Sequence, residues 1–185
     1  MKTTLCAAAA AAVLAGSAMA GDISPQVIEV DISNLVSFDG LGADGNETLS
    51  IDLPEGYDRV IGIGWDVVLE TYGASWASEA TIALGDSVEG ESLFLTPGNG
   101  NDAPLGEPTA FSTGGLIDLV ALELDFAVTS GVLSLELFES FDDVAGEADA
   151  GWLSGSTISV QVIPAPGAIA LLGVAGLVGT RRRRG

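Results

Sequence analysis

Apolar and polar residues alternate in several short stretches of the chain, which is the period of a β-strand with one buried face. The longest stripe covers residues 61–69 and includes Trp65, so we expect this ring in the core. The remaining strands predicted from the alternation cover residues 28–32, 49–53, 122–128, 133–137 and 158–162, with weaker candidates at 80–84 and 92–96.

Turns rich in glycine, proline and acidic residues separate these stretches, and no amphipathic helix of ordinary length competes with them. The pattern predicts an all-β fold, a single antiparallel β-sandwich with jelly-roll-like or immunoglobulin-like connectivity. Residues 129–131 lie between two predicted strands and indicate a hairpin. Residues 97–115 lack periodicity and predict a long loop, which is either functional or a plain connection.

Residues 1–20 have the pattern of a cleavable signal peptide. Lys2 precedes a short apolar run, and Ala18 and Ala20 supply the small residues that signal peptidase requires. The alternative, a permanent transmembrane anchor, needs about 20 apolar residues, and this run is shorter. Cutting after Ala20 would also remove Cys6, the only cysteine, and leave residues 21–163 as one folded domain without a disulfide.

Charge is distributed very unevenly along the chain. All 26 acidic residues lie between Asp22 and Asp149, where Arg59 is the only base, so this segment has a net charge of −25. Such self-repulsion weakens a compact state unless salt or bound cations screen it. The charge excludes nucleic acid as a partner, and it suits either a solvated surface in saline surroundings or specific cation binding.

The C-terminal tail, residues 164–185, has three parts. Pro164, Ala165 and Pro166 form a short proline motif, an apolar run over residues 168–178 follows, and Arg181, Arg182, Arg183 and Arg184 stand near the end. Proline lacks a backbone donor and ends strand pairing. As a helix the apolar run is shorter than a hydrocarbon core of about 30 Å, and the arginines would remain on the cytoplasmic side of the membrane.

This tail resembles a PEP-CTERM sorting signal, with Ala165 where glutamate is usual. The resemblance implies an exported protein of a Gram-negative bacterium that makes extracellular polysaccharide. It also implies an inner-membrane-anchored precursor, which an exosortase-like enzyme processes at the proline motif before the protein reaches the cell surface or the extracellular space. The alternative is a simple C-terminal membrane anchor that is never removed.

The predicted mature domain contains no histidine, cysteine or lysine. This composition excludes Ser-His-Asp and Cys-His catalysis, Schiff bases and zinc sites built from histidine or cysteine. Glycoside hydrolysis by two carboxylates remains open. We nevertheless expect a noncatalytic protein, because no motif selects a particular pair of acids.

Oxygen-rich loops are candidates for binding Ca²⁺, which takes carboxylate, amide and carbonyl ligands. The predicted metal ligands are Asp39, Asp44, Asn46 and Glu47 in one loop and Asp142 and Asp143 in a second, which also has Glu147 and Asp149 nearby. A third loop contains Asn99, Asn101 and Asp102. None of the three has the spacing of an EF-hand.

Trp76 lies in a turn with glycine and serine and is the candidate ring for stacking on a sugar, whereas the position of Trp152 stays open. The sequence therefore predicts an exported, noncatalytic cell-surface or extracellular-matrix protein, with exopolysaccharide or Ca²⁺ as its ligand. The alternatives are a lectin-like carbohydrate-binding module and a carboxylate-dependent glycoside hydrolase.

Overall fold

The computed structural model describes residues 24–141, 143 and 146–164 of the 185-residue chain. The predicted signal peptide with Ala18 and Ala20, the candidate ligand Asp142, and the tail from Ala165 through the four arginines lie outside the described residues. Within the described part every regular element is a β-strand, and no helix there is long and apolar enough to cross a membrane.

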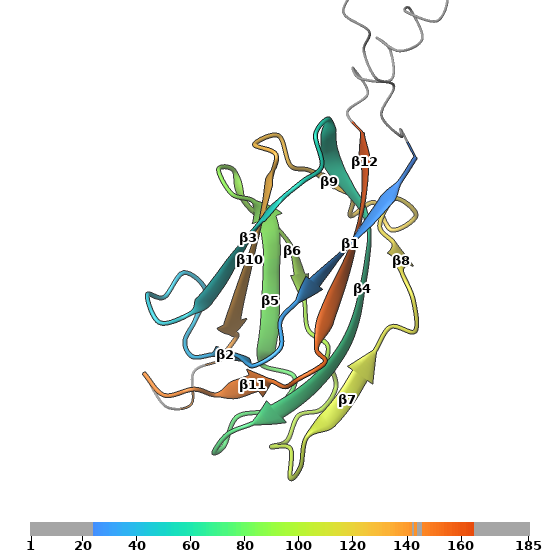
Figure 1. Cartoon of the computed structure of the whole chain (residues 1–185). Helices are drawn as coiled ribbons and strands as arrows, with labels where there is room; N and C mark the ends of the chain where they lie inside the picture. The colour runs from blue at the N-terminus through green and yellow to red at the C-terminus, as the bar shows by residue number, and fades with distance from the viewer. Residues whose placement is uncertain (1–23, 142, 144–145, 165–185) are drawn as a thin grey trace, which may run out of the picture.

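Two antiparallel sheets form the domain (Figure 1). The larger sheet has the order β1 (Gln26–Asp31), β12 (Thr157–Pro164), β4 (Tyr57–Thr71), β11 (Ala150–Trp152) and β2 (Leu35–Ser37), and β7 (Thr109–Ser112), β8 (Ile117–Asp118) and β9 (Phe126–Ala127) also pair with β4. The smaller sheet has the order β3 (Glu47–Asp52), β10 (Val132–Glu139), β5 (Ala80–Asp86) and β6 (Gly90–Leu95). The expected all-β fold with antiparallel sheets is confirmed.

Strand β4, with 15 residues, holds the larger sheet together. One of its edges pairs with β12 and then β11, and the other pairs with β9, β8 and β7 in turn. A register shift opposite β12 turns both Val60 and Ile63 into the core and leaves Ile61 half-buried. The buried face of the predicted stripe therefore begins at Ile63 and not at Ile61. Trp65 packs against the core but remains partly exposed.

The core lies between the two sheets. The smaller sheet contributes Leu133, Leu135 and Leu137, which the alternation predicted to face one way, and all three are fully buried. The larger sheet contributes Val160 among others, and Trp152 is also fully buried, which settles the position that the sequence left open.

The strand predicted over residues 122–128 is wrong for most of its length. Only Phe126 and Ala127 pair with β4, and the chain before them turns, with the Leu124 amide donating to the Leu119 carbonyl at 2.9 Å. Glu123 has a φ of 59°, which no strand residue adopts. Leu122 and Leu124 in this turn are exposed around a groove, whereas Val128 at the end of the segment is buried in the core.

The predicted hairpin at residues 129–131 is also wrong, although the turn exists. The Gly131 amide donates to the Val128 carbonyl at 3.1 Å and Gly131 has a φ of 76°, as a tight turn requires. However, β9 belongs to the larger sheet and β10 to the smaller one, so the turn carries the chain between sheets.

The long loop predicted over residues 97–115 contains a strand, β7, which pairs with residues 66–69 of β4. Its start is closely packed, because a Cβ atom on Gly98 would lie 2.4 Å from the carbonyl oxygen of Ala77. The segment therefore combines a packed start with a short edge strand that its weak apolar pattern does not reveal.

The two ends of the described domain lie together (Figure 1). The Tyr57 hydroxyl donates to the Ser24 carbonyl at 2.8 Å, and Tyr57 pairs with Pro164. Strand β12 thus continues to Pro164, which is buried, one residue beyond the predicted domain boundary. The strand pairing is irregular between Ile163 and Pro164, which is a place where a strand tolerates proline.

Candidate functional site

Acidic side chains gather at the end of the sandwich opposite the chain ends, where β2, β4 and β10 finish and β11 begins. We call this group the acid centre. Its members are Asp39, Glu79, Glu139, Asp143 and Asp149.

Glu139 is the most deeply buried member, with 1% of its surface exposed. One carboxylate oxygen accepts a short hydrogen bond from the Ser37 hydroxyl, and the other, Oε2, has no hydrogen-bond partner among the described residues. Burial raises the pKa of Glu139 to about 8, and the nearby charges of Asp149, Glu79 and Asp143 add to the increase. At neutral pH this side chain therefore holds a proton inside the protein.

Asp149 is buried beside it and ties the surrounding strand ends together. Its carbonyl accepts from the Tyr72 amide at 2.8 Å, and its amide donates to the Ser37 carbonyl at 2.9 Å. Burial raises the pKa of the Asp149 carboxyl as well, with a contribution from the charges of Asp143 and Asp39. Two buried carboxyls with raised pKa values thus share one end of the core.

The structure brings together residues that the sequence placed in separate loops. Asp39 belongs to the first predicted metal loop and Asp143 to the second, and the Gly146 amide donates to Asp39 Oδ1 at 3.4 Å. Glu139 and Glu79 were missed. A signal for Glu139 exists, because it continues the inward phase of Leu133, Leu135 and Leu137 as a charged residue in an apolar stripe.

The other predicted ligands of the first loop do not join the acid centre. Asn46 closes its own loop by donating to the Gly40 carbonyl at 2.9 Å and to Glu136 at 2.7 Å. Glu47 accepts from the Val36 amide at 3.0 Å, and Asp44 is exposed. These contacts give Asn46 and Glu47 structural roles.

The third loop likewise faces solvent at Asn99 and Asp102, while the Asn101 carbonyl accepts from the Ser78 amide at 3.3 Å. Within residues 24–141, 143 and 146–164, no three acidic side chains converge closely enough to hold a metal ion as they stand. A bound cation would require the carboxylates of the acid centre to turn toward one another.

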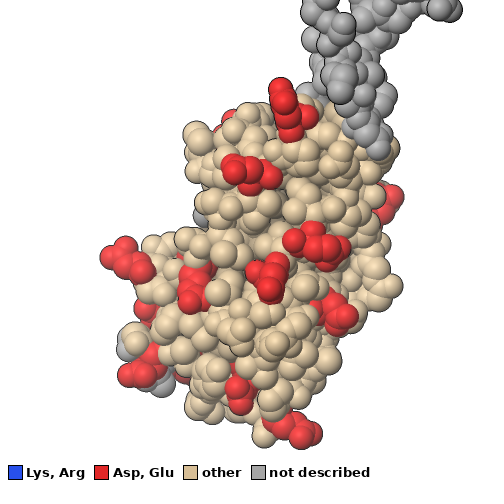
Figure 2. All heavy atoms as spheres, in the orientation of Figure 1, with Lys and Arg blue, Asp and Glu red and all other residues tan. Residues whose placement is uncertain are grey.

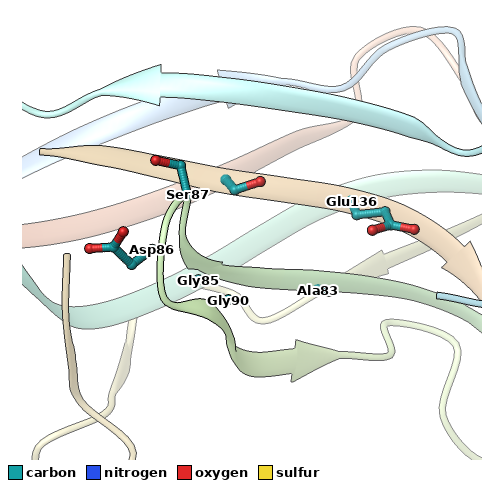
Figure 3. Close-up of a pocket in the computed structure, with 7 residues that line it drawn as sticks. Ala83, Gly85, Asp86, Ser87, Gly90 and Glu136 are labelled. Carbon is teal, nitrogen blue, oxygen red and sulfur yellow. The ribbon is translucent and has the colours of Figure 1, made fainter. Parts of the chain in front are cut away.

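A small groove on the outer face of the smaller sheet contains two more acids (Figure 3). Its cavity volume is about 90 Å³, enough for a few water molecules. Glu136 at one end accepts from the Gly42 amide at 2.6 Å, and Asp86 at the other accepts from the amides of Ser130 and Val88 at 2.9 and 2.8 Å. The hydrogen bonds from these backbone amides hold the pKa of Asp86 well below its usual range. Both acids therefore already have hydrogen-bond donors within the protein.

The candidate sugar-stacking residue Trp76 is 40% exposed, and its amide donates to Glu79 at 2.8 Å. Its ring is therefore accessible, whereas the buried ring of Trp152 is not. Acidic side chains are scattered over the visible face of the domain, and no basic side chain appears on it (Figure 2). Glu139 lies too deep to meet a polysaccharide bond, so the acid centre does not favour the glycosidase alternative.

No protein-family model matches the chain, and no curated protein matches it. Among solved structures, the chain is similar to the VP2 subviral particle of infectious bursal disease virus, with 19% identity, a TM-score of 0.39 and coverage of 78% of this chain and 35% of that chain. A T=1 particle derived from the same virus has 16% identity, a TM-score of 0.41 and coverage of 75% and 32%. The chain spans about a third of the length of these capsid chains, and a likeness this weak carries no argument about function.

Proposed function

We propose that the protein is an exported, noncatalytic component of the cell surface or extracellular matrix. The observation that carries this proposal is the presence of a signal-peptide pattern and a proline–apolar–arginine tail on either side of one strongly acidic sandwich. The closeness of Ser24 and Pro164, the two ends of the described domain, supports it, because both signals are then attached to the same end of the domain.

In this proposal signal peptidase cuts after Ala20 and the tail holds the exported domain at the inner membrane. An exosortase-like enzyme then acts at the motif of Pro164, Ala165 and Pro166 and removes the apolar run and the arginines. Pro164 is buried in β12, so an enzyme that reads the whole motif has to release the last residue of that strand.

Intact-mass measurement of the protein made in its own host tests this directly. We expect a chain that begins at Gly21 and lacks Arg181 through the C-terminus. A variant truncated after Pro164 keeps the whole of β12 and provides the control, since it should be secreted without being held at the membrane by the tail. A major species that keeps all four arginines at the cell surface would contradict the processing.

A second candidate function is Ca²⁺ binding at the acid centre, favoured by the unpartnered buried oxygen of Glu139. The ion would replace the proton on Glu139 and bring carboxylates of the acid centre together. We expect Ca²⁺ to raise the melting temperature of the wild-type protein more than Mg²⁺ at the same ionic strength, and to lose this effect in Glu139→Gln. The exposed Glu55→Gln is the matched control. Equal shifts with both ions would indicate charge screening alone.

A lectin-like role depends on the accessible ring of Trp76. Binding to exopolysaccharide from the host should then fall about fivefold in Trp76→Ala, because stacking on a single ring contributes on the order of 1 kcal/mol. Unchanged binding in this variant would remove Trp76 from consideration.

We also infer jelly-roll connectivity, the first of the two alternatives. In support, the larger sheet contains β1, β12 and β4 with β7 to β9 beyond, and the smaller sheet contains β3, β10, β5 and β6. Strands from the two halves of the chain thus alternate along β1, β12, β4, β11 and β2 of the larger sheet, and β10 lies between β3 and β5 in the smaller one, as expected when two Greek keys form a double-sheet jelly roll.

A further inference from the structure

A groove with an apolar lining opens at the side of the sandwich, between β6 of the smaller sheet and the β8 region of the larger one. Its cavity volume is about 360 Å³. Trp65 and Phe94 line it together with the leucines of the turn before β9, and its polar lining residues are Thr96 and Asn99. No charged side chain among the described residues lines this groove, although the domain around it has a net charge of −25.

Exposed apolar side chains concentrate around this opening. Three large side chains that line it have more than two-fifths of their surface exposed, and they are Phe94, Leu122 and Leu124. Scattered single apolar residues are normal on a protein surface, but a contiguous group beside a groove marks an interaction site.

The groove runs along the free edge of β6. Within the described chain, β6 pairs only with β5. Successive residues of a strand point to opposite faces, so a cavity on one face would be lined by Leu93 and Leu95 alone. Phe94 lines it too, which places the groove against the strand edge, where backbone groups have no ladder partner among the described residues.

We propose that this groove binds an extended segment of a separate protein, which adds as a strand to β6, inserts alternate apolar side chains and has lysine or arginine at its flanks. A strand edge gives main-chain hydrogen bonds and the groove gives pockets for alternate side chains. The acidic surface around the groove favours basic residues on either side of the bound segment. A second copy of this domain is disfavoured, because two domains of this net charge repel one another and the single arginine of each is already paired with Asp125.

Titration of the whole domain with a short synthetic peptide tests the proposal. The probe alternates valine and threonine between lysine flanks. Control peptides have the same composition in scrambled order, glutamate flanks, or a central proline that blocks strand pairing. We expect binding of the first peptide only, with amide exchange slowed along residues 90–95.

Leu122→Ser is the informative variant, because it removes apolar contact in the groove without changing charge. We expect it to weaken binding of the lysine-flanked peptide about tenfold, the loss that corresponds to exposing one buried leucine. Val88→Ser is the matched control, since Val88 is 81% exposed and does not line the groove. It should bind as the wild type does.

Several results would overturn the proposal. Equal binding of the scrambled or proline-containing peptide would show that the lysines bind the acidic surface without using the groove. Binding of the neutral dye Nile red with no peptide binding would make the groove a small-molecule site. Concentration-dependent dimerisation that Leu122→Ser abolishes would make a second copy the occupant.

Discussion

The acid centre and the groove beside β6 depart in opposite ways from the ordinary distribution of side chains. At one end of the sandwich, Glu139 and Asp149 are buried among strand ends. At one side, Phe94 and Leu122 are exposed around a groove with no charged lining residue among those described. Burying a carboxyl and exposing large apolar side chains both cost free energy, so both regions weaken the isolated domain.

The contrast shows where function is to be sought in a sandwich that is otherwise regular. Strand β3 and the first part of β10 follow the rule of apolar residues inside and polar residues outside, which stabilises the fold without identifying a ligand. The acid centre and the groove differ in the kind of ligand that would offset their free-energy cost. A proton, or the cation that we propose, would lower the cost of burying the carboxyls of the acid centre, and the proposed apolar segment would cover the exposed side chains of the groove.

The largest expected effect is the pH dependence of stability caused by Glu139, which ordinary surface acids should not show. The pKa of Glu139 is about 8 in the folded protein and its ordinary value is 4.5, so the folded state holds the proton more tightly. Its contribution to stability is complete below pH 4.5 and is lost as the pH rises through 8. We expect the unfolding free energy to fall by about 3 to 5 kcal/mol over this range.

Chemical denaturation at a series of pH values measures this, and Glu139→Gln should flatten much of the slope. Asp149, whose pKa is also raised, accounts for slope that remains. Glu55→Gln serves as the surface control. A wild-type stability that is constant between pH 5 and 9 would show that the buried carboxyls carry no such penalty.

A pair of leucine substitutions sharpens the comparison between core and groove. Leu135 is fully buried, so Leu135→Ala should reduce the unfolding free energy by about 2 to 5 kcal/mol. Leu122 is 55% exposed, so Leu122→Ala should change it by less than about 0.5 kcal/mol. Urea unfolding followed by tryptophan fluorescence provides both values. Similar losses in the two variants would mean that Leu122 belongs to the core.

Asp86 is a carboxylate whose pKa is shifted in the opposite direction from that of Glu139. Amides of Ser130 and Val88 satisfy it, and its lowered pKa means that it stabilises the folded protein at neutral pH and loses this effect as the solution becomes acidic. We expect Asp86→Ala to lower the melting temperature at pH 7 and to differ less from the wild type at pH 3. The exposed Asp52→Ala is the control. A destabilisation that grows toward acid pH would contradict this sign.

The smallest effect concerns the single described ion pair, between Arg59 and Asp125 at the segment leading into β9. The Arg59 Nε donates to Asp125 at 2.6 Å, and the arginine side chain is 43% exposed. We expect Arg59→Ala to cost less than about 1 kcal/mol, with the difference shrinking in high salt. A larger, salt-independent loss would show that Arg59 acts through packing.

Alternation along the sequence predicted the fold class and most of the long strands correctly, because one face of each strand is buried. It failed over most of the strand predicted at residues 122–128, because Leu122 and Leu124 line a groove and Glu123 adopts a turn conformation. It also could not reveal that β9 and β10 belong to different sheets, since local turn chemistry does not specify a strand's partner.

The acid centre was predictable only in pieces. Asp39 and Asp143 were expected to be near acids of their own loops, but the bond from Ser37 to Glu139 joins residues 102 positions apart. Such contacts follow from strand order, which hydrophobic periodicity does not determine. The useful local signal was a glutamate in the inward phase of β10, and it was visible without any knowledge of its partners.

The meeting of Ser24 and Pro164 beside Tyr57 has a mechanical consequence. Because the two ends of the domain lie side by side, a force applied there acts on the few residues of β1 and β12 nearest those ends, and the rest of the sandwich experiences almost none of it. If the tail holds the domain at the membrane, as we propose, a pull on it would separate Pro164 from Tyr57 before the rest of β12.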